Sequence, residues 1–339
     1  MAGDLRKRLK KLLGRYEVTT ILAVLLLGCI FSLFSSSFLT SYNLFNLGRT
    51  AAIYIFISIA QALVIIVGGM NLSLGFIGGL TVVAVGYSIQ EAGIPPMLAV
   101  LIGLCVGMIA GLLNGIVITA FRLNSFVVTL ATSFIFTGLI NGISQGYPYD
   151  QIPPSFTLIG RGGLFSVPYV LWLAILALAI LGYVFKYTVV GRRVLATGGN
   201  IEVAKMSGIN TNKTIILANV GSGLFAALAG ILWISRTGSA QPSTGADWML
   251  ISFAVAVIGG TVLKGGVFNP IGMFFASLLI VMVKNGLVML NANVYFEQAY
   301  LGVILLLAVS LESIRFLLNR KKMKRHLKEQ QLIEGKGKE

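Results

Sequence analysis

The sequence has few charged residues: Asp, Glu, Lys and Arg make up 11% of its 339 residues. A soluble domain needs roughly 25% charged residues to cover its surface, so the composition excludes an ordinary soluble domain. Apolar residues take their place, because 56% of the chain is hydrophobic and the mean hydropathy is +0.89. Forty residues are glycine, which helices in lipid tolerate. We therefore predict an integral membrane protein.

Residues that catalyse reactions or bind metals are also scarce. The two cysteines, Cys29 and Cys105, fall inside apolar runs and predict no disulfide framework. The single histidine, His326, belongs to a basic tail, and no cluster has metal-ligand spacing. The sequence also has no Gly-x-x-x-x-Gly-Lys-Ser/Thr phosphate loop. We expect no catalytic residue, no metal and no cofactor in this chain, which argues against an enzyme.

Apolar runs long enough to cross a membrane recur along the chain. Crossing about 30 Å of hydrocarbon takes about 20 helical residues, whose backbone groups pair within the segment. We predict an all-α integral membrane protein with about ten transmembrane helices, at residues 18–38, 50–68, 72–89, 97–120, 126–144, 167–187, 214–235, 250–263, 269–290 and 298–317. The transmembrane domain would span 18–318, between basic segments at 1–17 and 319–339.

The net charge of +15 has two explanations, a nucleic-acid partner or a membrane orientation. With ten spans and a cytoplasmic N-terminus, 22 of the 26 Lys and Arg residues fall on the cytoplasmic side. The others are Arg49, Arg161 and Arg236 outside, and Lys284 within a span. Cytoplasmic loops carry such an excess, so no nucleic acid is needed. Both termini are predicted to be cytoplasmic.

The ten spans could form two inverted halves of five helices each, a known arrangement in transporters. Glycines spaced by four mark the fourth span, at Gly103, Gly107, Gly111 and Gly115. Each step of four turns the helix by only about 40°, so these glycines form one groove where a neighbouring helix can approach closely. Glycine could also simply be common in such helices. Gly138, Gly142 and Gly146 repeat the spacing at the outer end of the fifth span.

Polar residues inside the spans are costly in lipid, so they face a cavity or another helix. The candidates for a solute path are Gln61, Asn71, Ser73, Asn114, Thr129, Asn219 and Asn285. A hydrogen bond between helices explains each of them as well as contact with a solute does. Lys284 either extends to the interface or lines a polar path. No acidic residue lies in mid-span, which argues against a proton or sodium relay and hence against a secondary carrier.

A polar, basic and glycine-rich stretch at 188–213 interrupts the apolar runs on the predicted cytoplasmic side. It contains a short helix candidate that Asn200 can cap and Gly208 can end. Such a helix could receive a push from another protein, or the stretch could be a solvated connector. If a partner binds, Ile201, Ala204 and Met206 would supply apolar contact area. Glu202 and Lys205 would fix the register through charges on the partner.

Several segments resemble permease subunits of bacterial ATP-driven importers of the ribose, xylose and galactose type, a class that includes the autoinducer-2 importer. GGNIEVAKMSGIN (198–210) is similar to that family's coupling segment. GGMNLSLG (68–75), NSFVVTLATSFIFTGL (124–139) and AVAVIGGTVLKGG (254–266) resemble further family segments, in order. The chain departs from the pattern at Asn71, Met249 and Ile251, which stand where the family usually has acids.

The resemblance implies a transport subunit of the bacterial cytoplasmic membrane, without an ATPase site, that forms the path for a sugar or sugar-like solute. It implies an ATP-binding subunit that uses ATP and Mg, and a soluble or lipid-anchored solute-binding protein, which the outer loop 145–166 is long enough to meet. A second permease chain, identical or different, would complete the path within the lipid. Branched-chain amino acids, a nucleoside or autoinducer-2 are alternative solutes, and a stand-alone channel or carrier is the alternative class.

Overall fold

The computed structural model describes residues 16–261, 265–290, 293, 296, 298–300, 302–303 and 306. Its helices are α2 (Tyr16–Phe34), α3 (Ser41–Ile66), α4 (Leu74–Gln90), α5 (Pro96–Ala120), α6 (Ser125–Ser144), α7 (Pro154–Arg161), α8 (Tyr169–Tyr187), α9 (Val189–Gly199), α10 (Ile201–Met206), α11 (Thr211–Thr237), α12 (Trp248–Ile258) and α13 (Pro270–Met289). The strands β1 (Gly163–Leu164) and β2 (Val167–Pro168) form an antiparallel hairpin.

Among these residues, seven helices are long and apolar enough to cross a membrane: α2, α3, α5, α6, α8, α11 and α13. The shorter α4 and α12 are also apolar. Each of the first nine predicted spans coincides with one of these nine helices, so the prediction of an all-α membrane protein is confirmed. Most of the tenth span, the tail at 319–339 and most of the segment at 1–17 lie outside the described residues.

Two predicted boundaries differ from the structure by five residues or more. Helix α3 begins at Ser41, nine residues before the predicted start, because Thr40 caps it by accepting a hydrogen bond from the Asn43 amide. Hydropathy missed residues 41–49 because Ser41, Asn43, Asn46 and Arg49 lower the average of this stretch. Helix α12 ends at Ile258 rather than at residue 263. A glycine pair follows it, and Gly260 has the left-handed backbone (φ 86°) that ends a helix.

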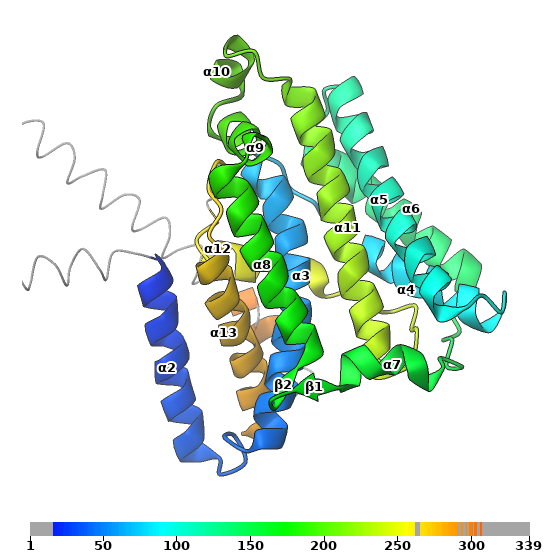
Figure 1. Cartoon of the computed structure of the whole chain (residues 1–339), viewed down its shortest axis with the longest axis vertical. Coiled ribbons are helices and arrows are strands. Elements are labelled where there is room, and N and C mark those ends of the chain that lie inside the picture. Colours follow the sequence, from blue (N-terminus) through cyan, green and yellow to red (C-terminus); the bar gives the residue numbers. More distant parts are fainter. Residues whose placement is uncertain are drawn as a thin grey trace, which may run out of the picture.

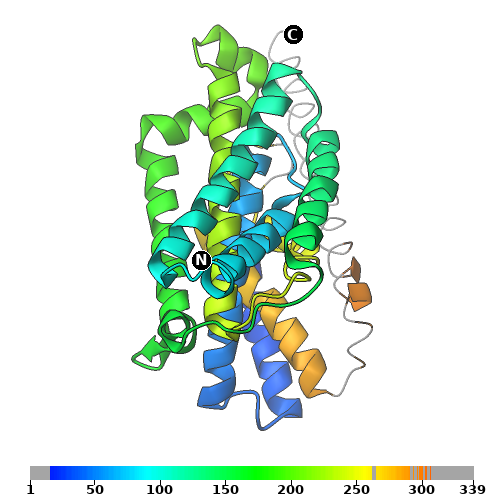
Figure 2. The ribbon, with the colours of Figure 1, turned by 90° about the vertical axis from the view of Figure 1, so that its right-hand side faces the viewer.

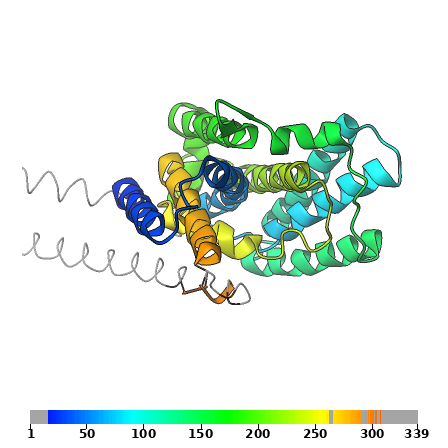
Figure 3. The ribbon, with the colours of Figure 1, turned by 90° about the horizontal axis from the view of Figure 1, so that it is seen from below.

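Helices α3 and α11 form the centre of the bundle. Nineteen of the 26 residues of α3 are buried, whereas α8 buries only four of its 19. Helix α11 packs against α5, α3 and α4. Helix α2 lies at the edge, where it packs on α13 (Figures 1 and 3). A central helix that is apolar on all sides therefore contacts protein, and the outer helices keep apolar side chains on the surface that suits lipid.

The glycine groove of α5 lies against α11. A Cβ atom at Gly111 would be 2.2 Å from the Asn219 carbonyl oxygen, and one at Gly223 would be 2.0 Å from the Gly107 carbonyl oxygen. Gly115 faces Ile216 in the same way, while Gly103 contacts α4 as well. The two backbones thus touch, which only glycine permits. Gly138 and Gly142 differ, because no other described residue comes within 4 Å of an added Cβ there.

The two ends of the bundle are built differently (Figures 1 and 2). One end, here called the α10 end, carries α9 and α10. The other, the α7 end, carries α7 and the β1–β2 hairpin. At this end Ser235 of α11 holds α7 in place, because its hydroxyl donates to the Phe156 carbonyl (2.6 Å) and accepts from the Gly160 amide (2.9 Å). The loop at 145–166 therefore contains a helix that is fixed to α11.

Candidate functional site

A break between α3 and α4 carries polar side chains into the middle of the bundle. Helix α3 ends in a glycine turn: the Gly68 amide (φ 82°) donates to the Ile65 carbonyl and the Gly69 amide to the Val64 carbonyl. The chain then runs without helical hydrogen bonds as far as Ser73. In lipid this would leave backbone groups unpaired, so the segment needs partners from neighbouring helices.

The first turns of α6 supply those partners. The Ser125 hydroxyl accepts from the Met70 amide (2.9 Å), and the Thr129 hydroxyl accepts from the Leu72 amide (3.0 Å). Thr129 also lies 3.2 Å from the Met70 carbonyl. Thr129, a predicted path residue, is thus fully buried and holds the broken backbone. Its role in the structure is to support the site.

Four fully buried side chains meet at this break. The side-chain oxygen of Asn71 accepts from the Ser73 hydroxyl (2.8 Å). The side-chain nitrogen of Asn71 donates to the Ser222 hydroxyl of α11 (2.9 Å). The Asn114 amide of α5 donates to the Ser73 hydroxyl (2.8 Å). A carboxylate at position 71 would lack the donor that Asn71 offers to Ser222. We call Asn71, Ser73, Asn114 and Ser222 the polar cluster.

Several amide atoms near the middle of the bundle have no hydrogen-bond partner among the described residues. They are both side-chain polar atoms of Gln61, and the side-chain oxygens of Asn114 and Asn219. Leaving a buried polar group unpaired costs about 1–3 kcal/mol. Such atoms are suited to contact a hydroxylated solute, because the three oxygens can accept from its hydroxyls and the Gln61 nitrogen can donate to them.

Sequence reasoning identified most of this site. It named Asn71, Ser73, Asn114, Thr129 and Asn219, which the fold brings to one region. It missed Ser222, which lies three residues after Asn219 on the same face of α11. It also named Asn285, which lies apart from these residues. Asn285 lies towards the α7 end, where its amide and that of Asn43 exchange hydrogen bonds of 2.9 and 3.1 Å.

A cavity of about 440 Å³ opens beside the cluster at the α10 end. It is bounded by the glycine turn after α3, the connection between α5 and α6, and α11, from which Asn219 contributes. Ile201, the first residue of α10, also lines it. The cavity therefore extends from α10 to Asn219, which lies about one helical turn from Ser222.

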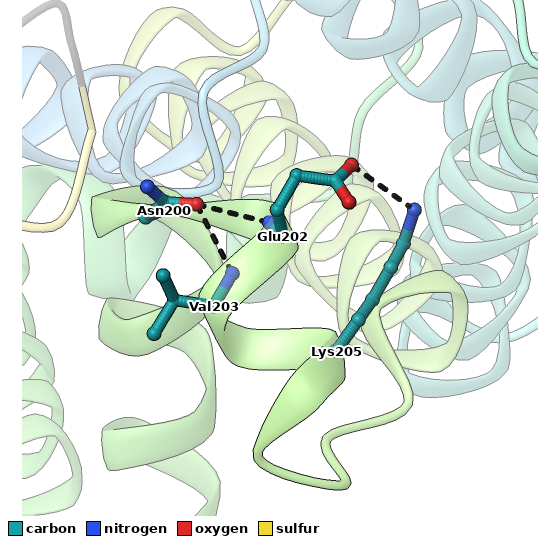
Figure 4. A network of polar contacts seen from close by, with 4 residues as sticks. All are labelled: Asn200, Glu202, Val203 and Lys205. Atoms are coloured by element: carbon teal, nitrogen blue, oxygen red, sulfur yellow. Dashed lines mark hydrogen bonds and ion pairs between the residues drawn. The ribbon is translucent and has the colours of Figure 1, made fainter.

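Helix α10 has the caps expected from the sequence (Figure 4). The Asn200 side chain accepts from the Glu202 and Val203 amides (3.0 and 3.1 Å). Gly208, with φ 77°, ends the helix, since the Ile209 amide reaches back to the Ala204 carbonyl. The Lys205 ammonium lies 3.7 Å from the Glu202 carboxylate, and both are largely exposed.

One expected contact residue of α10 is wrong. Ala204 is only 3% exposed, because it packs against its own chain, so it offers no area to a partner. Val203 is 56% exposed and Met206 is 88% exposed, and these two with Ile201 form the free apolar surface of the helix. The error arose because a six-residue helix gives too little periodicity to assign a buried face.

Helix α9, within the stretch expected to be a loop, connects α10 to the break. It is capped by Thr188, whose hydroxyl accepts from the Gly191 amide (3.1 Å). At its end, a Cβ at Gly198 would lie 1.5 Å from the carbonyl oxygen of Ile66, the last residue of α3. The same carbonyl accepts from the Gly266 amide (2.9 Å). The backbones of α9 and α3 are thus in direct contact, at the end of α3 that precedes the glycine turn.

One local sequence, Gly142–Gly146, has the Gly-x-Ser-x-Gly spacing of a hydrolase nucleophile. Its Ser144 is the last residue of α6, and the hydroxyl donates to the Ile140 carbonyl (2.7 Å). A nucleophile elbow needs a strand-to-helix turn that exposes the serine. This serine is buried at a helix end and so lacks that context.

Comparisons with known proteins give the family of the chain. Residues 43–309 match the family model described as branched-chain amino acid transport system / permease component. The chain is 35% identical to the ribose import permease protein of Bacillus subtilis over 293 residues, which cover 86% of this chain and 91% of that one. No solved structure matches the chain.

Two further relatives carry different solutes in their names. The galactose/methyl galactoside import permease protein of Escherichia coli is 30% identical, over 88% of this chain and 94% of its own. An autoinducer 2 import system permease protein of Yersinia pseudotuberculosis is also 30% identical, over 88% and 85%. The resemblance read from the sequence is confirmed. The chain belongs to the family of branched-chain amino acid transport system permease components, which are transport subunits, and is a multi-pass protein of the inner membrane.

Proposed function

We propose that the chain is the membrane-spanning permease subunit of an ATP-driven importer for a sugar or sugar-like solute. Relatives of nearly equal length are named as import permeases for ribose, galactosides and autoinducer 2. The polar cluster supports this proposal, because uncharged amides and hydroxyls are the groups that bind sugar hydroxyls. Branched-chain amino acids and nucleosides are the alternative solutes.

The energy would come from a separate ATPase subunit, which binds ATP and Mg. The chain has no phosphate loop to bind nucleotide. Helix α10 is the proposed docking element, since it presents Ile201, Val203 and Met206 beside an exposed ion pair. A helix of six residues is too short to be stable alone, so its caps and its contacts hold it in shape.

The contact between Gly198 and Ile66 is the observation that carries the coupling step. A push on α10 is passed to α9, and the end of α9 abuts the end of α3 without side chains between them. The next residues along the chain are the glycine turn and Asn71. Movement at α10 would therefore shift the break and open or close the polar cluster. Packed elements transmit such movements because interiors are dense and deform little.

In this proposal the α10 end faces the cytoplasm and both termini lie on that side. The α7 end receives solute from a soluble or lipid-anchored binding protein. A second permease chain, identical or different, completes the path. The neutral residues Asn71, Met249 and Ile251 stand where relatives usually have acids, which favours testing a different second chain as well as an identical one.

Replacing α10, residues 201–206, with a glycine-serine linker tests the coupling role. In membranes that contain the ATPase and the binding protein, we expect the variant to be inserted normally, to lose ATP-dependent uptake and to retain less ATPase on purification. The matched control replaces the connection between α4 and α5, residues 91–94, with the same kind of linker. Normal uptake with the ATPase still bound in the α10 variant would reject the proposal.

A further inference from the structure

The cavity of about 440 Å³ at the α10 end has walls from four parts of the bundle. They are the end of α3 with its glycine turn, the connection between α5 and α6, the first turns of α11, and Ile201 of α10. Figure 1 shows α10 and the start of α11 at the upper end of the bundle. Small-molecule sites have volumes of about 300–1,000 Å³, so this cavity can hold a compact solute. We call it the α10 cavity.

A buried amide gives the α10 cavity an unpaired acceptor. Asn219 of α11 is 1% exposed and belongs to the cavity wall. Its side-chain nitrogen donates to the Ile215 carbonyl (2.9 Å), one turn back along the helix. Its side-chain oxygen has no hydrogen-bond partner among the described residues. A buried acceptor is costly when it stays unpaired, and a hydroxyl of a bound molecule would pair it.

The connection between α5 and α6 supplies donors to the same cavity. The Asn124 oxygen caps α6 by accepting from the Phe126 amide (2.9 Å), so the Asn124 nitrogen is the group that can serve a ligand. The Ser125 hydroxyl accepts from the Met70 amide (2.9 Å), and it can donate its own hydrogen. Among the described residues, no acid lines the cavity. These groups suit a neutral molecule with several hydroxyls.

An occupant of the α10 cavity would touch both parts that the coupling step moves. Ile201 begins α10, and Gly68 and Gly69 form the turn that leads from α3 into the break. A Cβ at Gly68 would meet nothing within 4 Å, so the space beside this turn is open. A ligand shifts an equilibrium towards the arrangement that it binds better. A molecule that fills the space between Ile201 and the turn would therefore oppose a movement of α10 onto the turn.

We propose that the α10 cavity is an inhibitory site for the solute itself, so that imported sugar binds there from the cytoplasm and slows further import. This inference rests on the proposed function, which places the α10 end in the cytoplasm and gives the class of solute. The Asn219 oxygen accepts from one sugar hydroxyl, and Asn124 and Ser125 donate to others. The occupied cavity holds α10 in the position seen here.

Substitutions that fill the cavity test the site. Leu123 lines the cavity and is 48% exposed, whereas Leu217 of α11 is 51% exposed and lies outside the lining. The purified full-length chain is titrated with ribose and with galactose by calorimetry. We expect at least one of the two sugars to bind, and Leu123→Trp to weaken its binding about tenfold or more. Leu217→Trp, which adds the same bulk elsewhere at this end, should bind as the wild type does.

Ile215→Trp fills the cavity from α11 and should weaken binding in the same way, so the test stays decisive if one variant fails to fold. Thermal unfolding of each variant shows whether it is folded. The site is rejected if neither sugar binds the wild-type chain, or if the folded filling variants bind as tightly as the wild type. It is also rejected if Asn219→Leu alone loses binding, because the sugar would then bind in the polar cluster.

Uptake into vesicles tests the inhibition. Vesicles that contain the importer with its ATPase are loaded with ATP, and uptake of labelled ribose or galactose from the binding protein outside is measured with and without the unlabelled sugar inside. Internal sugar should slow initial uptake about fivefold or more in the wild type and in Leu217→Trp. It should have little effect in Leu123→Trp.

Equal inhibition in Leu123→Trp, or no inhibition in the wild type, would overturn the proposal. A complete lack of ATP-dependent uptake, even without internal sugar, would instead reject the proposed function. The calorimetric titration of the filling variants would then still decide whether the α10 cavity binds the sugar.

Discussion

The two ends of the helix bundle carry the same kinds of basic side chain and hold them in different ways. At the α10 end, Arg192, Arg193 and Lys205 are exposed on short helices. At the α7 end, Arg49 and Arg161 are bound to backbone carbonyls, and Lys284 is largely buried. Solvated charges can meet a partner protein and exchange it, while buried ones fix a local geometry. The α10 end is therefore suited to docking, and the α7 end to keeping a fixed local structure.

The largest effect is expected from labelling the two ends with an impermeant thiol reagent. In a background with Cys29 and Cys105 replaced by serine, Gln151→Cys near the α7 end should react from outside intact cells. Lys205→Cys should react only after the membrane is opened. Both residues are exposed in the structure. The reverse pattern would show that the α10 end faces outside and the α7 end faces the cytoplasm, which contradicts the proposed orientation.

A pair of adjacent glycines tests whether the α10 end drives the polar cluster. Gly198→Ala places a Cβ against the Ile66 carbonyl, whereas Gly199→Ala meets nothing within 4 Å. Overpacking costs about 1–3 kcal/mol, so we expect Gly198→Ala to reduce ATP-dependent uptake about tenfold or more. Gly199→Ala should transport normally. Equal uptake in both variants would show that α9 does not transmit the movement.

A second glycine pair tests whether the backbone contact between α5 and α11 stabilises the bundle that joins the two ends. Gly111→Ala would press on the Asn219 carbonyl, and Gly142→Ala on α6 faces open space. We expect Gly111→Ala to lower the free energy of unfolding by about 3 kcal/mol, because backbone cannot move aside. Gly142→Ala should have little effect on the chain alone. Denaturant unfolding of both variants provides the measurement.

The smallest effect compares one serine from each end. Ser235 at the α7 end is 3% exposed and bonds both Phe156 and Gly160, while Ser207 at the α10 end is exposed and bonds only Val203. Ser235→Ala should cost about 1–3 kcal/mol, since it leaves two buried groups unpaired. Ser207→Ala should stay within about 0.5 kcal/mol. Similar losses would mean that the α7 end is no more rigid than the α10 end.

The sequence by itself determined the features that depend on neighbours along the chain. Hydropathy located nine helices, and the spacing of Gly103, Gly107, Gly111 and Gly115 predicted a close helix contact. The Asn200 cap and the Gly208 stop followed from their side chains and backbone freedom. These signals are local, because a helix turn repeats every 3.6 residues and a cap acts within its first turn.

Only the tertiary structure decided which distant residues meet. Ser222 joins Asn71, and Arg161 of α7 binds the carbonyls at the end of α11. The sequence expected Ala204 to be accessible, and packing buries it. It grouped Asn285 with Asn71, and the fold pairs Asn285 with Asn43 instead. Which partner an amide or a cation finds depends on how helix faces are paired, and that pairing is set by close packing between backbones such as α5 and α11, α9 and α3.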